Sequence, residues 1–289
     1  METTFMKRTL ILGGAAILVL AGILFLIFHS KEKPAPAVEP TVAFKQEILG
    51  MSVEDRKIEA YTYGSGTKHF VFVGGIHGGY EWNSVVLAYE FLDYLNANSS
   101  TLPANLAVTV IPSANPDGVF KVIDKEGRFT AADVPMGVAQ EPGRFNAHKV
   151  DLNRNFDCKW QKEGTWKGKK VSAGTAAFSE PEARAIRDFV LRERPVAVVF
   201  WHSQANAVYA SQCEKGILPE VLAIMKAYSS AAEYPAADTF DAYAVTGAAE
   251  DWLASIGIPA ITVELKTHES IEWDKNLAGI KALLGYYGK

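Results

Sequence analysis

The sequence has little cysteine and no excess of basic residues, and each shortage excludes a class of protein. Only two of its 289 residues are cysteine, too few for a small scaffold held together by disulfides. The formal net charge of −4 argues against a nucleic-acid-binding protein, because such proteins usually carry a basic patch. Hydrophobic residues, however, make up 48% of the chain, so it has the apolar content to fold into one large or two medium domains.

An uncharged apolar run lies near the start of the chain. Thr9–Phe28 is twenty residues long, and a helix of that length covers ~30 Å, the thickness of a bilayer's hydrocarbon core. Lys7 and Arg8 precede it, which places residues 1–8 in the cytoplasm and the rest of the chain outside. A cleaved signal peptide is the alternative, but its apolar region is usually shorter, about 7–15 residues. We therefore expect residues 9–28 to be a transmembrane signal anchor of a single-pass cell-membrane protein.

The next segment differs in composition from everything after it. Residues 29–41 contain three prolines, which favour an extended, semi-rigid spacer, so we expect a tether there. From residue 42 to 289, short apolar runs alternate with stretches of helical periodicity. The expected strands are 57–63, 69–73, 106–111, 196–201 and 260–264, and the expected helices include 83–97 and 271–287. A further helix is expected to start at a capping box formed by Ser179 and Glu182 and to end near residue 192. This order predicts an α/β domain with a mixed, mostly parallel twisted sheet and helices on both faces.

Two histidines stand at the ends of apolar runs. His77 follows the predicted strand 69–73 through a glycine-rich turn, with Glu81 four residues later, and His202 directly follows the strand 196–201. Taken singly, each histidine would also fit a surface turn or a hydrogen-bonded core position. Together, His77, Glu81 and His202 make a set of two histidines and one carboxylate, which leaves a coordination position for water, as a catalytic zinc ion requires.

Further polar residues lie where strands or turns end. Arg144 and Arg154 have amide neighbours and suit a carboxylate or an oxyanion, because a guanidinium offers paired donors. Asp151 could hold a ligand histidine by its second ring nitrogen. Taken alone, this segment fits a polar turn better than a binding site. Glu264 ends an apolar strand, which is the setting either of a general base with a raised pKa or of a glutamate that faces solvent. Tyr243 lies in a glycine-containing loop.

As an ordered set, these segments resemble the zinc carboxypeptidase family of the carboxypeptidase A/B type. The family pattern has two residues between the first histidine and the glutamate, whereas this chain has three. The matching motifs cover nearly all of residues 42–289: His77-Gly-Gly-Tyr-Glu81, Asn115-Pro116-Asp117-Gly118, Asp151-Leu-Asn153-Arg154-Asn155-Phe156, His202-Ser203, the loop from Tyr243 to Asp251-Trp252, and Glu264.

The resemblance implies a zinc-dependent metallocarboxypeptidase with one zinc ion. It makes His77, Glu81 and His202 the zinc ligands, with Asp151 supporting His77. It makes Glu264 the residue that activates the zinc-bound water and passes its proton to the leaving amine.

The resemblance also assigns the residues that contact the substrate. It makes Arg144 the group that stabilises the oxyanion, although Arg128 lies nearby in the sequence. Asn153, Arg154 and Tyr243 would grip the terminal carboxylate of a peptide, so the enzyme would be an exopeptidase. Glu250 falls at the base of the side-chain pocket, where an acid would favour lysine, arginine or another amine-bearing end residue.

The two cysteines lie shortly after two of these motifs. Cys158 follows the Asn153-Arg154 motif and Cys213 follows the His202 motif. Both segments should border the same cleft, and a domain outside the cytoplasm permits oxidation. We therefore expect a disulfide between them.

The sequence is also compatible with three other functions. A peptidase acting on cell-wall peptides that end in diaminopimelate or lysine is the nearest one. A zinc deacylase of the same broad fold is less favoured, because Asn153, Arg154 and Tyr243 suit a peptide C-terminus. An inactive peptide-binding module is the third, and such descendants usually lose the general base or a zinc ligand.

Overall fold

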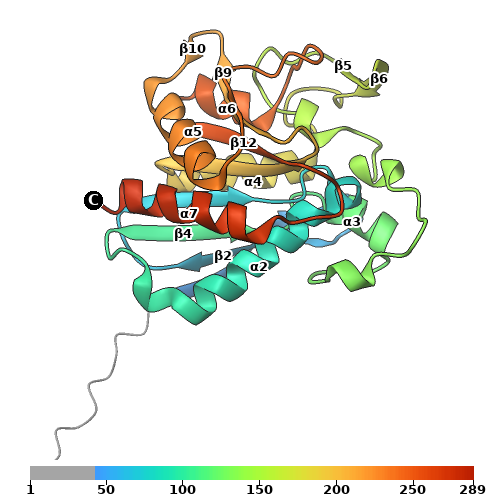
Figure 1. Ribbon diagram of the computed structural model, residues 1–289. Helices are drawn as coiled ribbons and strands as arrows, with labels where there is room; N and C mark the ends of the chain where they lie inside the picture. Colours follow the sequence, from blue (N-terminus) through green and yellow to red (C-terminus); the bar gives the residue numbers. More distant parts are fainter. Residues whose placement is uncertain (1–42) are drawn as a thin grey trace, which may run out of the picture. The chain divides into compact units, whose positions relative to one another are not determined.

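The computed structural model of the protein describes residues 43–289 (Figure 1). The predicted cytoplasmic segment, membrane anchor and tether, residues 1–41, lie outside these residues and stay predictions. Within residues 43–289, none of the helices combines the length and the apolar character needed to cross a bilayer.

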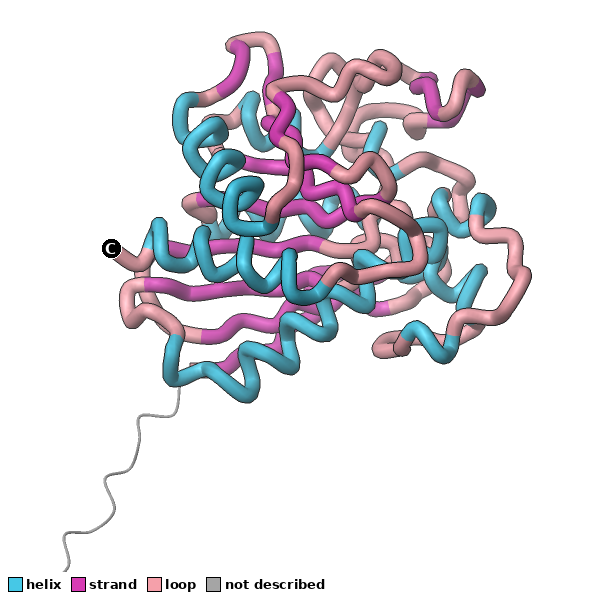
Figure 2. The backbone as a smooth tube through the Cα atoms, viewed as in Figure 1, coloured by secondary structure: helices cyan, strands magenta, loops and turns pink. Residues whose placement is uncertain are grey.

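An eight-stranded mixed sheet runs through the centre of this domain (Figures 1 and 2). Strands β4, β3, β7 and β12 run parallel to one another, while β1 with β2, β2 with β4 and β8 with β12 pair antiparallel. In spatial order the strands are β1 (Phe44–Met51), β2 (Lys57–Tyr63), β4 (Leu106–Ile111), β3 (Lys68–Val73), β7 (Ala197–Ser203), β12 (Ala260–Leu265), β8 (Ala207–Ala210) and β11 (Ala236–Ala237).

Both faces of the sheet are covered by helices, because the central strands are apolar on both sides. In β3, Phe70 and Phe72 belong to one hydrophobic cluster, while Val71 and Val73 belong to the other, which follows from the alternation of side chains along a strand. The first cluster contains residues of α2 (Trp82–Asn98), α3 (Pro116–Ile123), α5 (Pro219–Ala232) and α7 (Trp273–Tyr287), and the second those of α4 (Pro181–Glu193) and α6 (Ala249–Ser255). The predicted mixed α/β sheet with helices on both faces is confirmed.

The capping box predicted at Ser179 and Glu182 is wrong. Helix α4 begins at Pro181, which suits a first helical position because it lacks the N–H that would go unpaired there, and its N-cap is Glu180. The Ser179 hydroxyl instead donates to the Glu180 carboxylate over 2.8 Å. The Glu182 carboxylate accepts hydrogen bonds from the Val53 backbone and the Asn146 side chain.

The remaining elements are short and lie in the connections. Two hairpins stand apart from the main sheet, β5 (Glu163–Trp166) with β6 (Lys169–Ser172) and β9 (Gln212–Cys213) with β10 (Gly216–Ile217). The 3-10 helices are η1 (Gly78–Glu81), η2 (Ser99–Thr101), η3 (Ala131–Asp133), η4 (Glu141–Arg144) and η5 (Leu152–Arg154). Three of these, η1, η4 and η5, carry residues that the sequence marked as functional.

Candidate active site

The candidate site lies beyond the carboxyl ends of three parallel strands. β3, β7 and β12 are neighbours in the sheet, so the residues that follow them meet at one edge. His202 in β7 lies directly opposite Glu264 in β12, and His77 is the fourth residue after the end of β3. Parallel α/β sheets commonly bind ligands at such an edge.

The turn from His77 to Glu81 brings the two side chains into contact. Residues 78–81 form the tight 3-10 turn η1, and His77 Nδ1 lies 2.8 Å from Glu81 Oε1. Gly78 has φ +47°, and a Cβ there would come within 2.6 Å of the Gly143 carbonyl oxygen. The glycine is therefore required both by its backbone conformation and by the close approach of η4. The spacing that departs from the family pattern still brings the histidine and the glutamate together.

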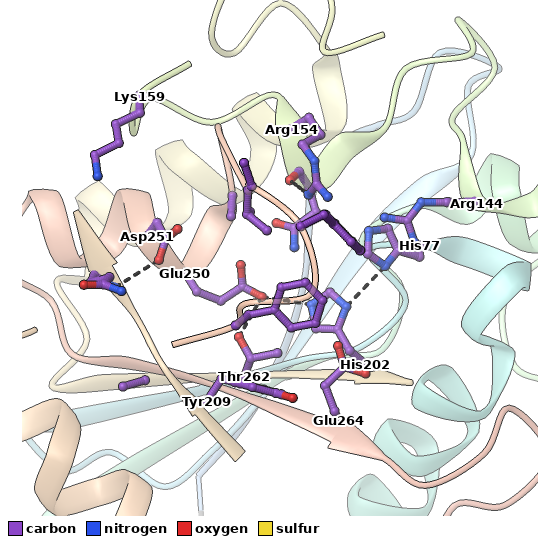
Figure 3. A pocket seen from close by; sticks show the side chains of 18 residues that line it. His77, Arg144, Arg154, Lys159, His202, Tyr209, Glu250, Asp251, Thr262 and Glu264 are labelled. Carbon is purple, nitrogen blue, oxygen red and sulfur yellow. Dashed lines mark hydrogen bonds and ion pairs between the residues drawn. The ribbon is translucent and has the colours of Figure 1, made fainter. Parts of the chain in front are cut away.

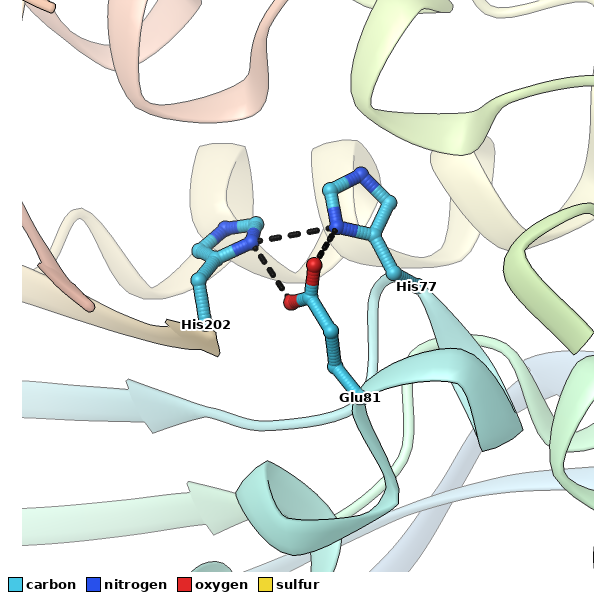
Figure 4. Close-up of side chains that lie close together, drawn as sticks. All are labelled: His77, Glu81 and His202. Atoms are coloured by element: carbon cyan, nitrogen blue, oxygen red, sulfur yellow. Dashed lines mark hydrogen bonds and ion pairs between the residues drawn. The ribbon is translucent and has the colours of Figure 1, made fainter. Parts of the chain in front are cut away.

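His77, Glu81 and His202 form one buried cluster of donors (Figure 4). His202 Nδ1 lies 3.0 Å from Glu81 Oε2 and 3.2 Å from His77 Nδ1, and the three donor atoms all lie within 4.8 Å of one another. Two imidazole nitrogens and a carboxylate are ligands typical of zinc in catalytic sites. The cluster is able to hold one metal ion, as the sequence predicted.

The far side of His77 faces Asp151. His77 Nε2 lies 3.4 Å from Asp151 Oδ1. The other carboxylate oxygen accepts a hydrogen bond from Arg144 Nε at 3.0 Å and forms an ion pair with Nη2 at 2.9 Å. Arg144 also lies 3.6 Å from Glu81, so it touches both buried acids. Its position is fixed further by Asn115, which caps α3 and donates to the Arg144 carbonyl.

The buried acids of this cluster are held ionised by their neighbours. Burial alone would raise the pKa of Asp151, but the guanidinium groups of Arg144 and Arg154 keep it well below its usual range. In the same way, burial opposes the charge on Glu81, yet the two histidines keep its pKa well below the usual value. An ionised carboxylate is the form that binds a cation.

In Glu264, by contrast, the effect of burial on the pKa outweighs that of the neighbouring charges. Burial raises the pKa of Glu264 to about 7, because it accepts only one hydrogen bond, from the Ala205 backbone N–H at 3.2 Å, and lies near other acids. A carboxylate with a pKa near neutrality is suited to accept and return a proton.

A cavity of about 270 Å³ opens beside the cluster (Figure 3). Asn153, Arg154 and Tyr243 all line it, as do Arg144 and Glu264. The lining also includes residues to which the sequence gave no role: Lys159, Tyr209, Gln212, Phe240, Asp251 and Thr262. Of these, only Asp251 belongs to a matched motif, the loop from Tyr243 to Asp251-Trp252.

Two of the predicted substrate residues are tied to the backbone of neighbouring segments. Arg154 donates to the carbonyls of Asn153 and Thr165 at 2.6 and 3.2 Å, and its guanidinium lies 5.8 Å from the centre of the Tyr243 ring. Asn153 Oδ1 accepts from the Ala249 backbone N–H. Both side chains are therefore held in place at the cavity wall.

Glu250 lines the cavity but is bonded to a predicted zinc ligand. Its Oε1 lies 2.9 Å from His202 Nε2, and Thr262 Oγ1 donates to the same oxygen at 3.2 Å. Sequence position alone did not reveal this contact. Ser203 belongs to the matched His202-Ser203 motif, but the sequence gave it no role: its backbone N–H donates to Glu81 at 3.2 Å and its hydroxyl to Asn83 at 3.0 Å.

The structure also decides between Arg128 and Arg144 and shows how the two cysteines are placed. Arg128, the competing candidate for the oxyanion role, pairs with Asp93 on the surface and does not line the cavity, whereas Arg144 does. Cys158 and Cys213 form a disulfide, with their Cα atoms 6.1 Å apart. Each cysteine adjoins a cavity residue, Lys159 or Gln212.

The fold and the donor set together define a metal-binding α/β protein with its site at a sheet edge. The model of the family described as zinc carboxypeptidase matches residues 37–278. The chain therefore belongs to the zinc carboxypeptidase family, whose members use zinc, and the resemblance drawn from the motifs is confirmed.

The proteins similar to this chain are named for different peptidase activities. The chain is 26% identical over 239 residues to gamma-D-glutamyl-L-diamino acid endopeptidase 1 of Lysinibacillus sphaericus, covering 75% of this chain and 59% of that protein. It is 27% identical over 263 residues to carboxypeptidase B of Helicoverpa zea, covering 83% and 60%. The chain thus spans about three fifths of the length of these relatives.

Solved structures of low sequence identity share the fold. Bovine thrombin-activatable fibrinolysis inhibitor, in complex with tick carboxypeptidase inhibitor, gives a TM-score of 0.66 at 20% identity, covering 86% of this chain and 89% of that one. The murein-tripeptide amidase MpaA of Escherichia coli O157 gives 0.57 at 21% identity, covering 86% and 96%.

Proposed function

We propose that residues 42–289 form a zinc metallocarboxypeptidase that removes residues from the C-terminal ends of peptides. The observation that carries this proposal is the composition of one cavity. Two residues of the donor cluster, His77 and His202, line this cavity together with Glu264. The residues predicted to bind the terminal carboxylate line it as well: Asn153, Arg154 and Tyr243. A chain end that enters it would meet a guanidinium suited to its carboxylate and place its last peptide bond toward the donor cluster.

In this proposal the metal is held by His77, Glu81 and His202. A zinc ion there would polarise the scissile carbonyl and lower the pKa of the attacking water. Glu264 would accept the proton of that water and deliver it to the leaving amine. Arg144, fixed by Asp151, would face the developing negative charge on the carbonyl oxygen.

The preference for an amine-bearing end residue is part of the proposal. The sequence based it on Glu250, whose carboxylate contacts His202. Asp251 lines the same cavity and accepts one hydrogen bond, from the Gln212 backbone N–H at 3.0 Å. Because the Glu250 carboxylate is bonded to His202, support for the preference comes from Asp251.

A cell-wall peptide is the second candidate substrate. Two proteins similar to this chain, the gamma-D-glutamyl-L-diamino acid endopeptidase and the murein-tripeptide amidase, carry such substrates in their names. Besides the charged residues already given a role, the cavity is lined by Lys159 and Asp251, so it presents one further charge of each sign. A diamino acid side chain that ends in both an ammonium and a carboxylate would match this pair.

Digestion of a peptide library, read by mass spectrometry, tests the proposal. The library contains peptides that end in lysine, phenylalanine or glutamate, together with cell-wall stem peptides. We expect release of single C-terminal residues, fastest from amine-bearing ends. Equal rates, or a preference for phenylalanine, would exclude the amine preference, and internal cleavage alone would exclude an exopeptidase.

The Glu264→Gln variant separates an enzyme from a peptide-binding module. Loss of a general base typically costs ~10²–10⁴-fold in rate, so we expect a fall in kcat of that size with zinc still bound. If the zinc-loaded wild type turns over none of the library peptides, the protein is a binding module instead.

The membrane location is also proposed, on the apolar run at residues 9–28. We expect the full chain to stay in the membrane fraction after an alkaline carbonate wash and a variant that lacks residues 1–28 to be released. Release of the full chain would contradict the anchor.

A further inference from the structure

Glu250 has a buried carboxylate that faces the back of a zinc-ligand candidate. The side chain comes from α6, a different element from both β7 and η1. Its residue is only 3% exposed, and Oε1 lies 2.9 Å from His202 Nε2. In Figure 3 the His202 ring lies between Glu250 on one side and His77 on the other.

The ring of His202 therefore has a distinct partner at each nitrogen. Nδ1 faces Glu81 and His77, at 3.0 and 3.2 Å, and Nε2 faces Glu250. His77 repeats this arrangement, with Nδ1 toward Glu81 and Nε2 toward Asp151. Each histidine of the cluster thus has one carboxylate on the metal side and another behind it.

A neutral imidazole carries one N–H, and the group that accepts it decides which nitrogen keeps a free lone pair. A carboxylate behind Nε2 favours the proton on that nitrogen, which leaves Nδ1 to bind a cation. Such a contact also fixes the ring plane and raises the basicity of the ligand atom.

We propose that Glu250 is a positioning residue for the metal: it accepts the Nε2–H of His202 and so aims Nδ1 at the ion. The resemblance to the family gave Glu250 a different task, at the base of the substrate pocket. This inference rests only on the zinc-binding part of the proposed function and needs no particular substrate.

Thr262 supports the assignment from a second side. Its hydroxyl donates to the same Oε1 at 3.2 Å, so this oxygen receives two hydrogen bonds. An oxygen used in this way is a fixed element of the site.

Zinc affinity of the folded full chain, measured by competition with a chromogenic chelator, tests the proposal. Glu250→Gln keeps the volume but removes the charge, and we expect zinc to bind ~10–100-fold more weakly, the usual cost of losing such a partner. Asp251→Asn is the matched control, because it removes the adjacent carboxylate of the same helix, and we expect less than a twofold change.

The tautomer of His202 is a second readout, which needs no variant. In zinc-loaded wild type with 15N-labelled histidine, we expect NMR to show His202 bound to the metal through Nδ1 and protonated at Nε2. Binding through Nε2 would overturn the proposal whether or not Glu250→Gln folds.

The outcomes distinguish this proposal from the peptidase proposal. If Glu250→Gln weakens zinc binding but the wild type cleaves no peptide, the positioning role stands and the peptidase activity fails. If Glu250→Gln changes zinc affinity less than twofold and instead removes the preference for amine-bearing ends, Glu250 is a substrate-binding residue and the positioning role is wrong.

Discussion

The disulfide between Cys158 and Cys213 should contribute a large share of the stability of the cavity wall. It joins the segment after η5 to the β9–β10 hairpin, two parts of the chain separated by 55 residues. The same segment is also held by a hydrogen bond from Gly247 N–H to the Cys158 carbonyl at 2.8 Å, and both cysteines belong to the hydrophobic cluster that contains Phe156 and Trp252. We therefore expect its removal to act on the whole domain rather than on a loose loop.

The size of the effect follows from the length of the closed loop. Closing a loop of 55 residues lowers the entropy of the unfolded chain by an amount worth about 4 kcal/mol at 25 °C. For a domain of this size, each kcal/mol shifts Tm by roughly 2–4 °C, so the loss corresponds to about 8–16 °C.

The assay compares wild type with a variant in which both cysteines are alanine. Thermal unfolding of wild type in the presence of reductant should match the double variant in its absence. Each single Cys→Ala variant is the control, since removing either sulfur already opens the loop and should give most of the shift. Zinc affinity should change less than twofold, because neither cysteine contacts the donor cluster.

Two results would refute this reasoning. One is a Tm shift below about 2 °C with the cysteines shown to be bonded in the wild type. The other is alkylation of both thiols in unfolded, unreduced protein, which would mean that no disulfide had formed.

Two further changes have effects whose direction the structure fixes. Gly78→Ala should lower the free energy of unfolding by about 1–3 kcal/mol and weaken zinc binding, because a Cβ is strained at a φ of +47° and would collide with the Gly143 carbonyl. Thermal unfolding measures the first effect and chelator competition the second. Gly127→Ala is the control that should leave zinc affinity unchanged, because Gly127 also has a positive φ but has nothing within 4 Å of the added Cβ. Burial raises the pKa of Asp251 to about 6 from 3.8, so the folded protein keeps a proton that the unfolded chain loses, and this carboxyl's contribution to stability is full below about pH 4 and is lost as the pH rises through 6. The free energy of unfolding of Asp251→Asn should therefore rise relative to that of wild type by up to roughly 3 kcal/mol between pH 4 and pH 7. Denaturant unfolding at several pH values measures this difference, and a difference that stays constant across the range would contradict the prediction.

The sequence alone was enough to predict the donor cluster and the general architecture. Apolar runs that end in His77, His202 and Glu264 placed these residues at strand ends, and parallel strands bring their carboxyl ends to one edge. The helices on both faces followed from strands without a polar side. These predictions depended on periodicity and residue type, which are local properties of the chain.

The membrane anchor is a different case, because it depends on residues outside the described part of the chain. The uncharged run at residues 9–28 still predicts it.

Only the tertiary structure decided how the charged residues are paired. Sequence position placed Glu250 at the base of a substrate pocket, whereas its carboxylate contacts His202 Nε2. Arg144 and Arg128 were both candidates for one role, until the fold put one beside Asp151 and the other beside Asp93. A buried charge needs a partner, but the partner comes from an element far away in the sequence. The residue types therefore determined which chemistry is available, and the packing of α6 and η4 against the sheet edge determined which atoms face one another.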